Sequence, residues 1–188
     1  MGQDSTIDKR THFESVYRQN RPAVLAYCLR RTEASEADDA CSETFLVAWR
    51  RIDDLPPPPG TLPYLYGIAG RVLSNHLRSI RRRSRLDEKL SNLGVAPHAD
   101  PAVLIVQSAR DQDVVKAVRT LKPKDREIVM LYAWEDQPRD AIAEMMGMSR
   151  AAIDQRIHRS YKRLGRILSP SVEVSAINSP PIARKGGT

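Results

Sequence analysis

PRDAIAEMMGMSRAAIDQRIHRSYKRL, residues 138–164, decides the fold of this chain because it predicts two short helices joined by a tight turn. Apolar residues recur at helical spacing in the first helix: Ala141, Ile142, Met145 and Met146. Gly147 follows at the position where many helices end with a left-handed residue, a conformation that glycine adopts without strain. Ser149 can then cap the second helix, because its hydroxyl can accept an unpaired backbone N–H.

The second helix of this stretch has one apolar face and one polar face. The apolar face carries Ile153, Ile157, Ser160 and Leu164, and the opposite face carries Ala151, Gln155, His158, Arg159 and Lys162. Packing of the apolar face against a third helix would leave the polar face outward. This is the helix-turn-helix geometry, in which the second helix enters the major groove of DNA. Two helices joined at a glycine also occur in all-α proteins that never bind nucleic acid, so this stretch alone leaves both interpretations open.

The composition sets limits on the kind of protein. A chain of 188 residues holds one ordinary domain or two small ones, and its formal net charge of +7 favours a polyanionic partner, although a basic surface can also serve solubility. Cys28 and Cys41 both fall on apolar helix faces, which predicts packed thiols in a reducing compartment. No apolar run has the length of a membrane span and the N-terminus lacks a signal-peptide core, so we expect a cytoplasmic protein without membrane insertion.

The rest of the chain also shows helical periodicity. We expect helices from His12 to Arg31, with Pro22 starting a second helix or kinking the first, and then a helix that buries Phe45. Pro56 to Pro59 and Gly60 predict a stiff loop before a helix that runs to about Arg83. The fold class is therefore all-α: two small helical domains, residues 12–84 and 101–168, joined by a flexible linker at 85–100. Residues 1–11 and 169–188 are polar and are expected to be disordered.

Four stretches, taken in order, resemble a bacterial RNA polymerase sigma factor of the extracytoplasmic-function group, in the sigma-70 family. FESVYRQNRPAVLAYCLRR (13–31) resembles the opening helices of that family, and EADDACSETFLVAWRRI (36–52) resembles its acidic and aromatic helix. LPYLYGIAGRVLSNHLRSIRRRSR (62–85) resembles the helix that recognises the minus-ten promoter element. LKPKDREIVMLYAWEDQPRDAIAEMMGMSRAAIDQRIHRSYKRL (121–164) resembles the domain that recognises the minus-thirty-five element. No single stretch is specific, but four in series are.

The resemblance implies a transcription initiation factor without catalytic activity or cofactor. It would bind the clamp helices and flap of core RNA polymerase, direct the enzyme to promoter DNA and help melt the minus-ten element. Candidate minus-ten residues supply charge, amide and aromatic groups: Tyr64, Tyr66, Arg71, Asn75, Arg78 and Arg82. Candidate minus-thirty-five residues lie on the second helix of the motif: Arg150, Asp154, Gln155, His158, Arg159 and Lys162.

The resemblance also implies a docking site for polymerase and a pocket for an unstacked base. The docking residues are outward Asp39, Glu43 and Thr44, supported from within by Phe45 and Trp49. In the family the loop before the minus-ten helix holds the flipped base. Here that loop is the proline run, so its backbone rather than side chains would shape the pocket. A separate anti-sigma protein that holds the chain inactive is left open.

Departures from the family pattern leave the promoter sequence undetermined. Tyr64 stands where the family usually has a tryptophan, and Arg71 stands where it frequently has an asparagine. QPRD at 137–140 replaces a run of small, aromatic and acidic residues. Asp154 stands where a base-reading cation is common. A carboxylate there can accept from the N4 amino group of cytosine, or it can pair with Arg150 or His158 and orient them. The orienting role is favoured because an aspartate at the edge of the helix reaches a neighbouring cation more easily than it reaches a base.

Three alternatives are weaker. A free-standing helix-turn-helix regulator would need a dimer interface or a receiver domain, and neither is visible in residues 12–84. An enzyme acting on nucleic acid is disfavoured because His12, His76, His98 and His158 lack metal-ligand spacing and no nucleophile–base pair is apparent. A carboxylate metal site at Asp38, Asp39 and Glu43 is disfavoured because Asp38 and Asp39 point in different directions on a helix.

Overall fold

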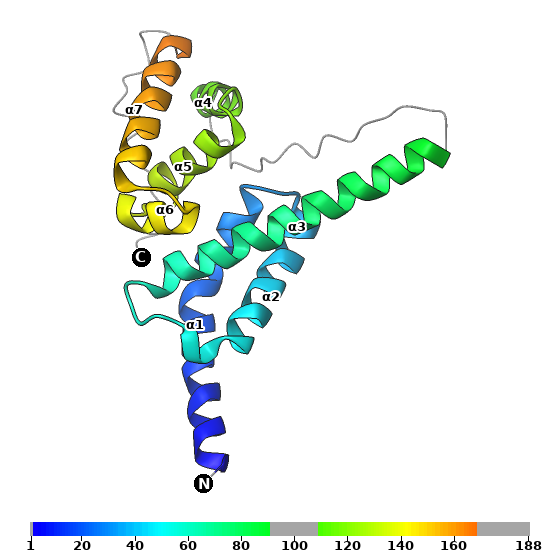
Figure 1. Ribbon diagram of the computed structural model, residues 1–188, viewed down its shortest axis with the longest axis vertical. Coiled ribbons are helices and arrows are strands. Elements are labelled where there is room, and N and C mark those ends of the chain that lie inside the picture. Colours follow the sequence, from blue (N-terminus) through cyan, green and yellow to red (C-terminus); the bar gives the residue numbers. More distant parts are fainter. Residues whose placement is uncertain (1, 91–108, 169–188) are drawn as a thin grey trace, which may run out of the picture. The chain divides into compact units, whose positions relative to one another are not determined.

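The computed structural model describes residues 2–90 and 109–168, and all regular elements in those ranges are helices (Figure 1). The chain divides into two compact units, one containing α1 to α3 and the other containing α4 to α7. This architecture confirms the predicted all-α class with two small helical domains.

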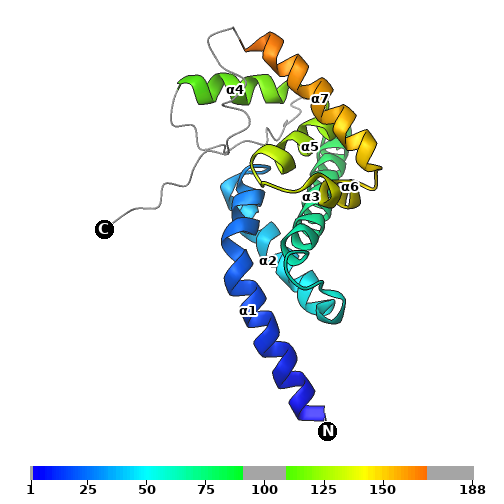
Figure 2. The same cartoon turned by 90° about the vertical axis from the view of Figure 1, so that its left-hand side faces the viewer.

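The first unit is built from three long helices and a loop. The long helices are α1 (Gly2–Leu29), α2 (Ala34–Arg50) and α3 (Thr61–Leu90). The short 3-10 turn η1 (Ile52–Asp54) lies in the connection between α2 and α3. Each long helix packs against the other two. The N-terminal part of α1 projects beyond α2 and α3 in both views (Figures 1 and 2).

The helix ends differ from the predicted boundaries. α1 is continuous through Pro22, which neither starts a new helix nor ends the first. The backbone of residues 2–11, predicted as disordered, is helical as well. A proline removes one N–H from the helical ladder, but its fixed φ suits a helix, so the element can continue. α3 runs to Leu90, so the predicted linker (85–100) begins inside a helix; its remainder and the predicted tail (169–188) lie outside the described residues.

The core of the first unit lies where the three helices meet. Its most fully buried side chains include Leu65, Val24, Thr44 and Cys28. The thiols of Cys28 and Cys41 are both buried, as predicted, and burial raises the pKa of Cys41 above its usual value. The rings of Tyr27 and Tyr66 stack with centroids 4.8 Å apart and join α1 to α3.

The second unit is organised around its last helix. It contains α4 (Ala109–Arg119), α5 (Pro123–Ala133), α6 (Arg139–Met146) and α7 (Arg150–Ile167), and α7 contacts the other three. α6 lies at the N-terminal end of α7, and α4 lies toward its C-terminal end (Figure 1). Apolar residues of α4, α5 and α7, with one residue after α4 and one after α7, form one core: Ala117, Val118, Leu121, Val129, Met130, Leu164 and Leu168.

The turn between α6 and α7 follows the predicted chemistry. Gly147 is left-handed, with φ 60° and ψ 45°, and ends α6. The amide of Met148 donates to the carbonyl of Ala143 at 2.9 Å, which closes the turn. The hydroxyl of Ser149 accepts from the amide of Ala152 at 3.2 Å, which confirms Ser149 as the N-cap of α7. These contacts fix the direction in which α7 leaves the turn.

Candidate functional site

α7 presents one buried face and one exposed face. Ile153, Ile157, Ser160 and Leu164 are buried, and the opposite face exposes Ala151, Gln155, His158, Arg159 and Lys162. Asp154 borders the exposed face, where it lines a shallow, open hollow together with Gln155, His158 and Arg159. The predicted minus-thirty-five residues are therefore brought together on one side of α7, with Arg150 at the start of the helix.

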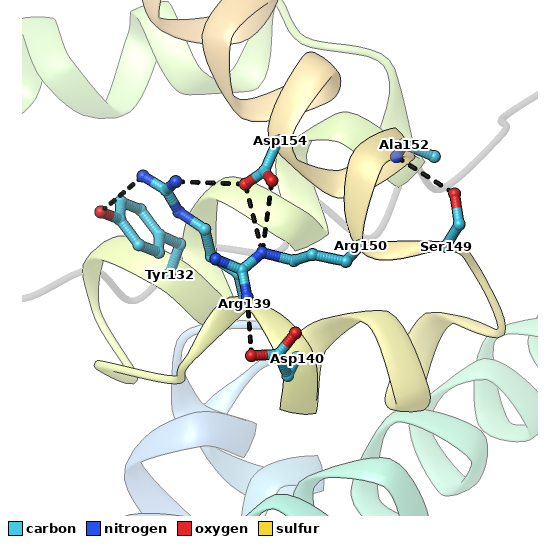
Figure 3. A network of polar contacts seen from close by, with 7 residues as sticks. All are labelled: Tyr132, Arg139, Asp140, Ser149, Arg150, Ala152 and Asp154. Atoms are coloured by element: carbon cyan, nitrogen blue, oxygen red, sulfur yellow. Dashed lines mark hydrogen bonds and ion pairs between the residues drawn. The ribbon is translucent and has the colours of Figure 1, made fainter.

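Asp154 lies at the centre of a network of charged side chains (Figure 3). Its Oδ1 is 3.1 Å from Nη1 of Arg139 and 3.4 Å from Nε of Arg150. Nη1 of Arg150 lies 2.6 Å from Oδ2 of Asp140. Nη2 of Arg139 donates to the hydroxyl of Tyr132 at 3.2 Å. The network thus ties α7 to α5 and α6.

The network further stabilises the charged form of both arginines. The hydrogen bond with Tyr132 raises the pKa of Arg139, and the hydrogen bond with Asp140 raises the pKa of Arg150.

Arg150 was predicted as a partner of Asp154; Arg139 and Asp140 were not predicted as members of this site. Arg139 is 15 residues from Asp154, so helical spacing could not pair them. The available signal was the unusual QPRD run itself, which places an arginine at the start of α6.

α3 exposes the basic and amide row that the sequence predicts. Arg71, Asn75 and Arg78 are exposed on one side of the helix. Nη2 of Arg78 donates to Oδ1 of Asn75 at 3.1 Å, and Nε of Arg78 donates to the carbonyl of Ser74 at 3.2 Å. The side chain of Arg82, predicted as part of the same row, lies outside the described part of the chain.

The two tyrosines at the start of α3 differ. Tyr64 is half-buried, so part of its ring remains accessible. Tyr66 is only 4% exposed and stacks on Tyr27, so the prediction that it stacks on a nucleic-acid base is wrong for this conformation. The reason is that α3 packs against both α1 and α2, which buries a wider arc of its surface than a single stripe.

A hollow of about 410 Å³ lies between α1 and the proline loop. Its lining consists of His12, Ser15, Val16, Gln19, Asn20, Pro58, Pro59, Thr61 and Leu62. The hydroxyl of Thr61 donates to the carbonyl of Pro56 at 2.7 Å and holds the loop against the start of α3. Polar side chains of α1 as well as the prolines line this space. Whether the loop backbone shapes a pocket for an unstacked base stays a prediction.

α2 carries the predicted docking residues, but not all of them face outward. Asp39 and Glu43 are exposed, and Oε2 of Glu43 lies 2.7 Å from Nε2 of His76 on α3. Phe45 is buried, as predicted. Thr44 was predicted to face outward but is fully buried, and its hydroxyl donates to the carbonyl of Ala40 at 2.7 Å. α2 packs against two helices, which leaves no outward position at Thr44.

Trp49 lies at the surface rather than within the core, which corrects the prediction of a purely supporting role. Its side chain is 39% exposed, and its ring packs edge-on against Phe13 with centroids 5.1 Å apart. Leu46 and Tyr17 are also exposed, and the prediction did not include them. Leu46 is an apolar residue off the buried stripe of α2, which is the signal that could have identified it. We call Tyr17, Leu46 and Trp49 the exposed apolar group.

Comparison with known families assigns both units. Residues 16–83 match the family described as Sigma-70 region 2, and residues 111–164 match Sigma-70, region 4. These two ranges correspond to the two helical units, in the order that a sigma factor has them. The chain belongs to the sigma-70 family. The resemblance inferred from the four sequence stretches is confirmed, and a free-standing regulator is not favoured.

Curated sigma factors resemble the chain along most of its length. The probable RNA polymerase sigma factor RfaY of Xanthomonas campestris pv. campestris is 30% identical over 87% of this chain, which spans 41% of that protein. RNA polymerase sigma factor YlaC of Bacillus subtilis is 23% identical over 89% of this chain and 98% of its own length. The ECF RNA polymerase sigma factor BldN of Streptomyces coelicolor is 30% identical over 83% of this chain and 60% of its own length.

Solved sigma-factor structures share the fold. The sigma factor RpoE from Bartonella quintana, in complex with the anti-sigma factor NepR, gives a TM-score of 0.66 at 22% identity and covers 86% of this chain and 99% of its own. CnrH, in complex with the cytosolic domain of CnrY, gives a TM-score of 0.57 at 22% identity over 85% of this chain and 88% of its own. At this level of identity the likeness concerns the fold alone.

Metal-binding clusters and membrane-spanning helices are both absent from the part of the chain that the structure describes. Within residues 8–79 and 112–168, whose side chains the structure describes, no group of three or more His, Cys, Asp or Glu side chains is arranged to hold a metal ion. Across the same ranges, no helix combines the length and the apolar character that a membrane crossing requires.

Proposed function

We propose that this chain directs core RNA polymerase to specific promoters and helps melt the minus-ten element, without catalysing a reaction itself. One observation supports the proposal: each of the two sigma-70 regions presents an exposed row of basic and amide side chains along a single helix. Because it acts on RNA polymerase and the chromosome, its proposed place of action is the cytoplasm.

The row on α3 suits an opened minus-ten element. Arg71 and Arg78 supply positive charge for phosphates, and Asn75 supplies an amide for a base edge. The carbonyl oxygen of Asn75 already accepts from Arg78, which leaves its NH₂ group to donate to a base. The hollow beside the proline loop is the proposed place for an unstacked base, with Tyr64 close in sequence to the residues that line it.

The exposed face of α7 suits the major groove of the minus-thirty-five element. Gln155 can bond bidentately to adenine and Arg159 to guanine, while Lys162 can bind phosphate. Arg150 lies at the N-terminal end of α7, the end from which recognition helices reach base edges. These four side chains are therefore the proposed DNA contacts of α7.

The exposed apolar group, together with the acidic residues Asp39 and Glu43, is the proposed contact with polymerase. Exposed aromatic and leucine side chains on a small domain are typical of a protein interface. The clamp helices and the flap are the proposed partners on core RNA polymerase. An anti-sigma protein is a further proposed partner, because the solved RpoE relative of the same fold is bound to one.

A gel-shift experiment separates this proposal from a free-standing regulator. Labelled promoter duplex is incubated with the chain alone, with core polymerase alone, and with both. We expect a specific, heparin-resistant complex only when both proteins are present. A specific complex formed by the chain alone on duplex DNA, unchanged by core polymerase, would instead support a free-standing regulator.

A further inference from the structure

We propose that Arg139, a residue of α6 outside the recognition helix, sets the base preference of α7 by holding the carboxylate of Asp154. This inference rests on the proposed function, because it concerns recognition of the minus-thirty-five element. Arg139 is a positioning residue in this account: it acts on DNA through Asp154 and Arg150.

The position of Asp154 makes its charge important for binding. Its side chain is 41% exposed and lines the same hollow as Gln155, His158 and Arg159. A free carboxylate there would repel phosphate and would favour cytosine, because the N4 amino group of cytosine is a donor that a carboxylate can accept from. The groups that hold this carboxylate therefore decide whether it takes part in base recognition.

Arg139 is held from two sides. Its Nη1 lies 3.1 Å from Oδ1 of Asp154, and its Nη2 donates to the hydroxyl of Tyr132 at 3.2 Å. Its guanidinium carbon also lies 5.0 Å from the centre of the Tyr132 ring. A guanidinium fixed by a hydrogen bond and an aromatic face on α5 is pre-organised to bind a carboxylate on α7. Asp154 therefore meets a cation that is already in place.

Arg150 approaches the same carboxylate from the start of α7. Its Nε lies 3.3 Å from Oδ2 of Asp154, while its Nη1 lies 2.6 Å from Oδ2 of Asp140. Two arginines and two aspartates alternate, so the four formal charges cancel (Figure 3). With Arg139 in place, Asp154 is shared between two cations. Without Arg139, the carboxylate is left to Arg150 alone or is free to turn toward DNA.

The consequence is a specific change in recognition. Removal of Arg139 should leave the exposed face of α7 intact. It should also leave the carboxylate of Asp154, at the edge of that face, partly unpaired. Base preference should then shift toward cytosine at one position of the upstream element, by roughly 5- to 100-fold, the range that one base contact supplies. A residue that only stabilised the fold would lower the yield of complex without changing the preferred base.

The test uses holoenzyme assembled from core polymerase and the full chain. A promoter library with a randomised minus-thirty-five element is transcribed, and the transcribed templates are sequenced. The variants are Arg139→Ala, Asp154→Ala and the double variant. The matched control is Arg156→Ala, because the ion pair of Arg156 with Asp125 likewise joins α7 to another helix of the unit, α5, but does not involve Asp154.

We expect Arg139→Ala to change the preferred base at one position, and Arg156→Ala to select the same element as wild type. In the Asp154→Ala background, Arg139→Ala should cause no further change. If Arg139→Ala selects the wild-type element, or causes the same change with and without Asp154, the proposal is overturned. If Arg139→Ala does not fold by circular dichroism, Arg139→Gln, which removes the charge and keeps donor groups, takes its place under the same criteria. A wild-type chain that selects no element at all would contradict the proposed function rather than this inference.

Discussion

Asn75 and Arg78 lie one turn apart on α3 and share a hydrogen bond of 3.1 Å, so each side chain helps to orient the other. The two residues nevertheless differ in what they can do on DNA. An amide can distinguish base edges, whereas the proposed partner of the Arg78 guanidinium is phosphate, which carries no sequence information. Their substitution should therefore produce different defects.

Asn75→Ala should slow promoter opening more than it weakens the closed complex. The loss of one base contact predicts an opening defect of about tenfold, within the range expected for a single base contact. Permanganate footprinting of the minus-ten element measures opening, and filter binding at low temperature measures the closed complex. Normal melting by this variant would place the base contact elsewhere.

Arg78→Ala should weaken binding to all promoters by a similar factor. It should also lower the slope of log affinity against log salt by about one unit, because one phosphate contact is lost. A salt titration with two unrelated promoters checks both statements. An effect confined to one promoter would argue for base recognition by Arg78.

Gly147→Ala should destabilise the second unit by about 1–2 kcal/mol, the usual penalty of the left-handed conformation for an L-residue. A Cβ added at Gly147, whose φ is 60°, would meet no atom within 4 Å, so the penalty comes from the backbone alone. Gly165→Ala is the matched control, because Gly165 is exposed inside α7, where alanine is favoured by about 0.5–1 kcal/mol. Denaturant unfolding of both variants should give shifts of opposite sign.

At the scale of the helix, α2 carries a buried aromatic residue directly beside an exposed apolar one. Phe45 is buried and packs against Tyr17, with ring centroids 4.7 Å apart. Leu46, the next residue, is 48% exposed. Adjacent residues of one helix thus belong to the core and to the proposed polymerase contact, respectively.

Leu46→Glu should weaken binding to core polymerase by roughly tenfold or more, the size of an interface hot spot, with little change in stability. Phe45→Ala should instead lower the free energy of unfolding by about 3–5 kcal/mol, because it leaves a cavity in the core. Fluorescence anisotropy with labelled chain measures core binding, and denaturant titration measures stability. Unchanged core affinity of Leu46→Glu would remove Leu46 from the interface.

Local sequence signals were sufficient for the presence of the helices and for the turn at Gly147, because both depend on local spacing and local backbone conformation, but they did not give the ends of α1 and α3. These signals were insufficient for Thr44, Tyr66 and Trp49, whose exposure depends on how many helices pack around them. A helix that packs between two neighbours buries a wide arc of its surface. The width of that arc cannot be predicted from one apolar stripe in the sequence. The pair of Arg139 and Asp154 was missed for a related reason, since it joins different helices.

At the scale of the whole molecule, Leu168 is the last described residue and is part of the core of the second unit. Its side chain is only 6% exposed and packs with residues of α4, α5 and α7. The core of this unit therefore requires the chain to extend at least to Leu168.

Truncation after Leu168 should preserve initiation on a strong promoter, because residues 169–188 are Ser-, Pro- and Gly-rich and offer little apolar area to bury. Leu168→Ala in the full chain should lower stability by about 2–5 kcal/mol through a core cavity. Transcription assays and thermal unfolding check the two statements. Loss of transcription by the truncated chain, with normal unfolding, would reveal a contact made by the tail.

Run-off transcription tests the central claim most directly. Core polymerase is incubated with a library of genomic promoter fragments, with and without the chain, and transcript start sites are mapped. We predict starts that appear only when the chain is present and that share one pair of upstream elements at a fixed spacing. Start sites that are the same with and without the chain would contradict the claim that it is a promoter-specific sigma factor.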